Sequence, residues 1–200
     1  MVRYPAGRTA SYPELLELAK EAAPKGRDFV VVAESFSGPV AMEWGAQCPA
    51  NLKALVLCCT FASNPLPWPL RWLRLGLGSW WFRRSLPKWV IRTLLVGQAE
   101  DSLVEDVRNS VEKVTAEVLS NRVRLALETD VRFMLERIDL PVLCLRAEQD
   151  RILGRHCDAE LRRLLAQASH QTLPGPHLLL QRRPTLAAAQ VNAFLDSLGS

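Results

Sequence analysis

Residues 29–42 read Phe-Val-Val-Val-Ala-Glu-Ser-Phe-Ser-Gly-Pro-Val-Ala-Met, and this stretch decides which fold the sequence predicts. The Phe and the three Val at its start are typical of a buried strand. The apolar residues after Gly38 recur at helical spacing. Ser35 lies between the two elements, and the residues two positions away, Ala33 and Ser37, are both small. A tight strand-to-helix turn has no room for large side chains there, so the stretch predicts a sharp turn with Ser35 at its apex.

A serine at such an apex is presented above the sheet, where its hydroxyl can act as a nucleophile. The next backbone N–H, that of Phe36, is expected to point toward an oxyanion that develops on a substrate. The helix that starts near Gly38 adds the positive end of its dipole. A second interpretation stays open, in which Ser35 only caps the helix. The motif usually has a glycine two residues before the serine, and this sequence has Ala33 there.

The composition predicts one globular domain. The chain has 200 residues, of which 48% are hydrophobic and 23% charged, enough for a sizeable core. A net charge of +4 is too small to argue for nucleic-acid binding. No apolar run reaches membrane-spanning length, and the N-terminus does not resemble a signal peptide. The five cysteines show no Cys-x-x-Cys pair and no zinc-ligand spacing, so we expect no metal, no cofactor and a location in the reducing cytoplasm.

Further segments alternate between strand and helix character. A helix capped by Ser11 is expected before the strand at residue 29, and residues 2–5 are expected to be the tail of another strand. Strands joined by helices through short links predict a mostly parallel α/β sheet with flanking helices and right-handed crossovers. The later strands are expected at residues 52–59, 141–146 and 170–173, and the later helices at residues 158–168 and 185–198.

Residues 64–92 differ from the rest of the chain, because prolines punctuate them and arginines alternate with five of the six tryptophans. Three interpretations compete: a helical lid over a pocket, a contact with an anionic membrane surface, and stacking on single-stranded nucleic acid. The segment lies between two sheet strands, which favours the lid, keeps membrane contact as an alternative and argues against nucleic acid. With amphipathic helices over residues 101–137, we expect a lid insertion at 64–137 and a core of 1–63 and 138–200.

Three chemistry-bearing residues each follow the end of a predicted parallel strand: Ser35, Asp150 and His177. The carboxyl ends of parallel strands meet at one edge of a sheet, where ligands bind. A nucleophile, an acid and a histidine in this chain order are the set required for nucleophilic catalysis by serine. The alternatives from the sequence are Glu148 as the acid and His156 or His170 as the base.

The residues carrying these roles stand in three segments: VVAESFSGP around Ser35, PVLCLRAEQD ending at Asp150, and PGPHLLLQ around His177. With them the chain resembles α/β-hydrolase-fold serine esterases that carry a helical lid between the strand after the nucleophile and the strand before the acid. The resemblance covers nearly the whole chain and implies a truncated α/β-hydrolase fold. It implies cleavage of a small apolar carboxylic ester through an acyl-enzyme. Acyl transfer, thioester cleavage, or a catalytically weak interaction or membrane-surface module remain alternatives.

The resemblance also exposes a difference at the N-terminus. Such proteins normally begin with further strands and a His-Gly-type loop that supplies a second oxyanion N–H, and no counterpart stands in the first thirty residues of this sequence. Losing one oxyanion donor typically costs ~10²–10³ in turnover. The strand before Ser35 would then lie near the sheet edge, which favours aggregation unless it is covered. We therefore expect residues 1–5, or a second copy of the chain in a homo-oligomer, to pair with this edge.

Overall fold

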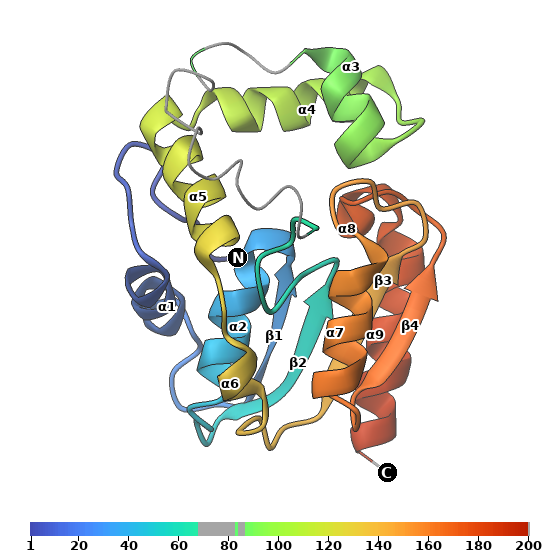
Figure 1. Cartoon of the computed structure of the whole chain (residues 1–200). Coiled ribbons are helices and arrows are strands. Elements are labelled where there is room, and N and C mark those ends of the chain that lie inside the picture. The colour runs from blue at the N-terminus through green and yellow to red at the C-terminus, as the bar shows by residue number, and fades with distance from the viewer. Residues whose placement is uncertain (68–82, 84–86, 200) are drawn as a thin grey trace.

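The structure is a computed structural model that describes residues 1–67, 83 and 87–199. Its centre is a four-stranded sheet in the order β1-β2-β3-β4, with neighbouring strands parallel (Figure 1). The expected parallel α/β sheet with flanking helices is therefore confirmed. The strands are β1 (Phe29–Glu34), β2 (Leu52–Cys58), β3 (Val142–Ala147) and β4 (Ser169–Leu173).

The register of the strands brings their carboxyl ends together. Glu34, the last residue of β1, pairs with Cys58, the last of β2. On the other side of β2, Cys58 is opposite Leu145 of β3. The two central strands are apolar because helices cover both of their faces, as is usual for parallel strands. Residues that follow these strands therefore lie along one edge of the sheet.

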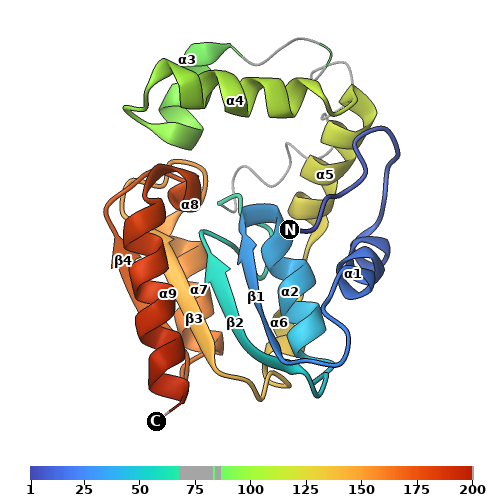
Figure 2. The same ribbon diagram turned by 180° about the vertical axis from the view of Figure 1, so that it is seen from behind.

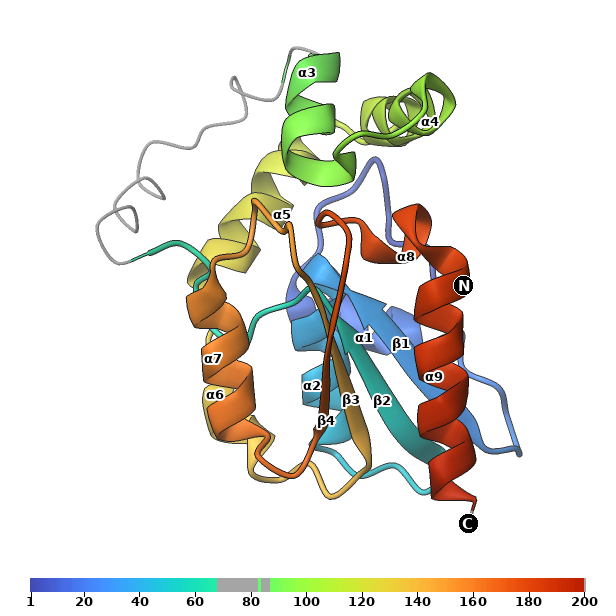
Figure 3. The ribbon, with the colours of Figure 1, turned by 90° about the vertical axis from the view of Figure 1, so that its right-hand side faces the viewer.

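Helices cover both faces of the sheet, as Figure 3 shows from the side. Two separate hydrophobic cores lie between the sheet and these helices. One core joins the sheet to α1, α2, α6 and α7, and it includes Met42, Trp44 and Leu161. The other joins it to α8 and α9 through Leu179 and Phe194. The bounds are α1 (Tyr12–Glu21), α2 (Gly38–Gly45), α6 (Arg132–Leu135), α7 (Arg155–Leu164), α8 (Leu179–Arg182) and α9 (Pro184–Leu198).

Helix α1 begins where the sequence predicts, because its start is encoded locally. The Ser11 hydroxyl accepts the backbone N–H of Glu14 at 3.4 Å, and the Glu14 carboxylate accepts the backbone N–H of Ser11 at 2.8 Å. This reciprocal pair is a capping box, which satisfies N–H groups that a helix start leaves without partners.

Of the described helices between β2 and β3, α3 and α4 lie above the carboxyl edge of the sheet and α5 descends beside it, as Figures 1 and 2 show. A small core of Ile91, Val96, Ala99 and Val104 joins η4 to α4. Four of the five tryptophans expected in the lid, Trp68, Trp72, Trp80 and Trp81, lie outside the described residues. The fifth, Trp89, is 69% exposed. The elements are α3 (Lys88–Val90), η4 (Ile91–Val96), α4 (Asp101–Glu112) and α5 (Ala116–Glu128).

The N-terminus differs from what the sequence predicts. Residues 1–10, all of which the structure describes, contain no strand, so the expected strand at residues 2–5 and its pairing with β1 are wrong. Met1, Val2 and Tyr4 instead line an open hollow of about 560 Å³ beside β1. Nothing in the local pattern of these residues specifies a ladder partner, and Val32 on β1 stays 50% exposed. Pairing with a second copy remains a prediction.

Among the described helices, none combines the length and apolar character that crossing a membrane requires.

Candidate active site

Ser35 follows β1 directly and begins the short turn η1 (Ser35–Ser37) that leads into α2. Its φ of 55° lies in the left-handed region, which residues other than glycine rarely adopt. Thr60, just after β2, donates its hydroxyl to the carbonyl oxygen of Ser35 at 2.6 Å. A neighbouring strand end therefore supports the strained backbone that carries the serine.

The same threonine explains why a glycine follows this turn. A Cβ added to Gly38 would lie 1.8 Å from the Thr60 hydroxyl oxygen and 2.6 Å from its Cβ. No real side chain tolerates such a contact, so α2 can approach β2 only because residue 38 has none. The requirement for a small residue, inferred from the motif for the positions around Ser35, is strongest at Gly38.

The structure brings the three sequence-predicted residues together. Ser35 Oγ and His177 Nε2 are 2.8 Å apart, although 142 residues separate them in the sequence. His177 Nδ1 lies 2.8 Å from Asp150 Oδ2. The side chains of His177 and Asp150 are only 3% and 5% exposed. The arrangement has the geometry of a nucleophile, a base and an orienting acid.

Asp150 is held in place by its own loop. Its second oxygen, Oδ1, accepts the backbone N–H groups of Ile152 and Leu153, both at 2.8 Å. These bonds leave Oδ2 to face the imidazole of His177. A carboxylate in this position accepts Nδ1–H and leaves the lone pair of Nε2 directed at Ser35.

The alternatives left open by the sequence lie elsewhere. Glu148 is exposed and accepts the side-chain amide of Gln149 at 2.9 Å. His156 Nε2 lies 3.0 Å from the carbonyl oxygen of Pro65. His170 Nε2 lies 3.1 Å from the carbonyl oxygen of Leu165. The described contacts of Ser35 and His177 instead join Ser35 to His177 and His177 to Asp150, so the geometry favours Asp150 and His177.

Phe36 contributes its side chain to the packing of the turn. The ring stacks on Tyr12 with a centroid separation of 5.1 Å and meets Tyr4 edge-on at 6.2 Å. These contacts anchor α1 and the N-terminal segment against the residue after Ser35. The proposed role of the Phe36 backbone N–H as an oxyanion donor remains a prediction.

One residue of this site was missed in the sequence. Glu34 accepts the backbone N–H of Leu180 at 3.1 Å, the side-chain amide of Gln181 at 2.8 Å and the thiol of Cys58 at 3.8 Å. Burial raises the pKa of this carboxyl group. It ties the end of β1 to the helix that follows His177. The available signal was an acid at the end of an otherwise apolar strand.

The described residues contain no group of three or more His, Cys, Asp or Glu side chains placed to hold a metal ion. The five cysteines are free thiols, and four of them are buried.

Comparisons with known proteins agree with this architecture. Residues 4–191 match the sequence model of the alpha/beta hydrolase family. No curated protein sequence is significantly similar to the chain.

Several solved structures share the fold. A hydrolase from Pseudomonas aeruginosa PA01 aligns with a TM-score of 0.73 at 21% identity, over 96% of this chain and 74% of that one. A thermophilic esterase from Thermogutta terrifontis aligns with a TM-score of 0.76 at 18% identity, over 96% of this chain and 75% of the esterase. An enol-lactonase from Burkholderia xenovorans LB400 aligns with a TM-score of 0.74 at 17% identity, over 94% of this chain and 74% of the lactonase. At these identities the similarity establishes a common fold.

Proposed function

The chain belongs to the alpha/beta hydrolase family, and from this premise we propose that it hydrolyses carboxylic esters through a covalent acyl-enzyme. The observation that carries the proposal is the continuous hydrogen-bonded path from Ser35 through His177 to Asp150, with both contacts at 2.8 Å. A serine hydroxyl is a weak nucleophile at neutral pH, and a neighbouring imidazole is the group that activates it.

In the first half of the reaction, Ser35 Oγ attacks the ester carbonyl carbon while His177 Nε2 accepts the proton of the Ser35 hydroxyl. Asp150 keeps the imidazole in the required tautomer and stabilises the imidazolium that forms. The Phe36 N–H donates to the oxyanion. The tetrahedral intermediate then breaks its bond to the alcohol oxygen, which receives the proton from His177 and leaves.

In the second half, water replaces the alcohol. His177 accepts a proton from the water as its oxygen attacks the acyl carbonyl, which re-forms the tetrahedral oxyanion. Collapse of this intermediate breaks the acyl–Ser35 bond and releases the acid. The proton returns from His177 to the serine oxygen, and the enzyme is ready for another turnover.

We propose a small apolar ester as the substrate class. The support is the position of α3 and α4, which belong to the proposed lid insertion of residues 64–137 and lie above the strand ends that carry Ser35 and Asp150 (Figure 1). The small apolar core that joins η4 to α4 supports the proposal, because it packs these two elements against each other. Such a cover would exclude water from an acyl-enzyme.

The test is hydrolysis of p-nitrophenyl butyrate by the wild type, by Ser35→Ala and by a matched control, Ser110→Ala. Ser110 is exposed on α4, and its hydroxyl only donates to a carbonyl of its own helix, so its loss should leave activity unchanged. Ser35→Ala is expected to reduce kcat by ~10³-fold or more.

Activity of Ser35→Ala equal to the wild type would overturn the proposal, as would the absence of turnover in folded wild-type protein across ester and thioester substrates. Product analysis with added alcohol separates hydrolysis from acyl transfer, because a transferase forms a new ester instead of free acid.

A further inference from the structure

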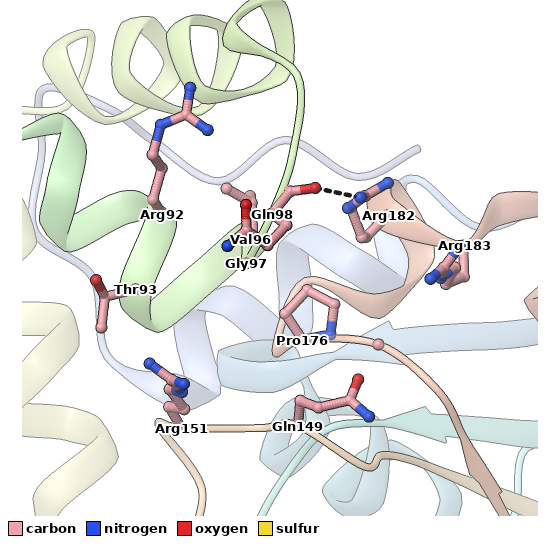
Figure 4. A pocket seen from close by; sticks show the side chains of 11 residues that line it. Arg92, Thr93, Val96, Gly97, Gln98, Gln149, Arg151, Pro176, Arg182 and Arg183 are labelled. Atoms are coloured by element: carbon pink, nitrogen blue, oxygen red, sulfur yellow. Dashed lines mark hydrogen bonds between the residues drawn. The ribbon is translucent and has the colours of Figure 1, made fainter.

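Four arginines line one cavity of about 370 Å³ beside the loops that follow β3 and β4 (Figure 4). Arg92 comes from η4, Arg151 from the loop after β3, and Arg182 and Arg183 from the end of α8 and the residue after it. These segments are far apart in the sequence, so only the fold brings their positive charges together. Among the described residues that line the cavity, none is acidic.

Two of the four guanidinium groups are held in position by the protein. Arg92 donates to the carbonyl oxygen of Ala99 at 2.7 Å and forms an ion pair with Asp101, whose side chain is 88% exposed. Arg182 donates to the carbonyl oxygen of Gln98, the contact drawn in Figure 4. Carbonyl oxygens do not neutralise charge, and Asp101 faces solvent, so the cavity keeps a strong positive potential.

The other two, Arg151 and Arg183, are exposed and have no hydrogen-bond or ion-pair partner within the described part of the chain. The acid nearest to Arg151 in this loop other than Asp150 is Glu148, which does not line the cavity and accepts the amide of Gln149. Asp150 itself is directed at His177. Arg92 is paired with Asp101, but the charges of Arg151, Arg182 and Arg183 have no acidic partner among the described residues and repel one another unless an anion from outside joins them.

The chemistry of the lining selects the kind of anion. A guanidinium presents a planar fork of donors that matches the oxygens of phosphate and carboxylate groups. One carboxylate engages one such fork, whereas a phosphate group has enough oxygens to meet several. The volume is within the range of small-molecule sites. We propose that this cavity binds the phosphate group of a phosphorylated ligand.

The site is separate from the hydrolytic chemistry. Ser35 does not line the cavity, but Gly175 and Pro176, which immediately precede His177, do. A bound phosphate group would therefore contact the loop that carries the base without contacting the nucleophile. Binding needs no ester hydrolysis, so it can be measured whether or not the chain is an esterase.

The experiment is calorimetric titration with inorganic pyrophosphate at fixed ionic strength. Wild type and Ser35→Ala are expected to bind it saturably at one site with equal affinity. The double variant Arg151→Gln/Arg183→Gln is expected to bind about 100-fold more weakly, about tenfold for each lost charge-assisted contact. Both arginines are exposed and without partners, so these changes should not affect folding, which urea unfolding checks.

The matched control is Arg27→Gln/Arg163→Gln, which removes the same charge from two exposed arginines that do not line the cavity. Its affinity for pyrophosphate should equal that of the wild type. An equal loss in both double variants would show diffuse surface electrostatics and overturn the proposal.

A second arm identifies where the phosphate comes from. Flotation with phosphatidylcholine vesicles, with and without phosphatidic acid, is compared for the wild type and the two double variants. Pyrophosphate binding without vesicle binding indicates a soluble phosphorylated ligand. Binding to phosphatidic acid vesicles that requires Arg151 and Arg183 indicates a lipid headgroup at the same site. Failure of both probes to bind would refute the site.

Discussion

The carboxylate of Glu34 accepts the backbone N–H of Leu180 at 3.1 Å across a sequence separation of 146 residues. Glu34 immediately precedes Ser35, and Leu180 lies three residues after His177. The bond therefore joins the strand that presents the serine to the helix that follows the histidine. With Gln181 bound to the other carboxylate oxygen at 2.8 Å, this contact holds the two halves of the candidate site in register.

Replacing Glu34 should loosen this link. In Glu34→Ala, the half-buried Leu180 N–H loses its acceptor, and an unsatisfied buried group costs about 1–3 kcal/mol, whereas the exposed Gln181 amide can turn to water. We expect lower unfolding free energy in urea and a lower kcat for p-nitrophenyl butyrate. Glu34→Gln is the conservative control, because its carbonyl still accepts from Leu180 while its amide group opposes that of Gln181. Full activity and stability in Glu34→Ala would contradict the linking role.

The same carboxyl group predicts a pH dependence of stability. Burial raises the pKa of Glu34 above its ordinary value of 4.5, so the folded state holds this proton more tightly than the unfolded state. The contribution of Glu34 to the unfolding free energy is therefore largest below 4.5 and falls as pH rises through the raised pKa. Glu34→Gln removes this titration. Urea unfolding from roughly pH 4 to 8 should show the wild type losing stability relative to Glu34→Gln; parallel profiles would contradict it.

Gly38→Ala should be poorly tolerated, because the new methyl group would lie 1.8 Å from the Thr60 hydroxyl oxygen. Either α2 or β2 must shift, which typically costs about 1–3 kcal/mol or more. The shift would also disturb the Thr60 contact with the carbonyl of Ser35. Gly7→Ala is the control, since nothing lies within 4 Å of its added Cβ. Thermal unfolding and ester hydrolysis should both separate the two variants, and equal melting temperatures would disprove the crowding argument.

The strained backbone of Ser35 predicts that a serine at this position lowers the stability of the fold relative to a glycine. Its φ of 55° favours glycine over any residue with a Cβ. Ser35→Gly should therefore be more stable than Ser35→Ala by about 1 kcal/mol, since left-handed backbone costs a non-glycine residue about 1–2 kcal/mol. Both variants lose the hydroxyl, so the comparison isolates the backbone. Both should be inactive, and a less stable Ser35→Gly would show that the turn carries no such strain.

Asp150→Asn tests the orientation of the imidazole. The carboxylate accepts from Nδ1 of His177, whereas an amide can donate to Nδ1 and stabilise the tautomer that places the proton on Nε2. That tautomer cannot accept the proton of Ser35, so we expect kcat/KM to fall on the order of 10³–10⁴-fold. Glu148→Gln, two residues away and exposed, should leave the rate unchanged. A larger loss in Glu148→Gln than in Asp150→Asn would reassign the acid.

Local patterns predict the elements of this fold because their partners are close in the sequence. The β-branched run before Ser35 and the capping box of Ser11 and Glu14 each act over a few residues, and both appear as expected. The alternation of strands and helices is local in the same sense. The parallel sheet expected from it is confirmed, and the α/β-hydrolase fold implied by the resemblance is confirmed by the family match over residues 4–191.

The end of each strand was also enough to nominate Ser35, Asp150 and His177, because parallel strands place their following residues on one edge. The sequence also favours His177 over His170, because His177 follows the strand expected at residues 170–173 whereas His170 lies at its start. Both are near β4, and only the three-dimensional course of the loop shows which imidazole meets the serine at 2.8 Å. The catalytic role of these residues is tested by the activity of the Ser35→Ala and Asp150→Asn variants described above.

The sequence by itself thus determined the elements, their order and the edge at which the candidate site forms. Tertiary structure alone decided the bond from Glu34 to Leu180, the absence of a strand at residues 2–5 and the arginine cavity. The reason is physical: periodicity, caps and turns depend on neighbours in the chain, whereas these features depend on the register and packing of segments separated by many residues. A single polar side chain carries no local sign of a partner 146 residues away.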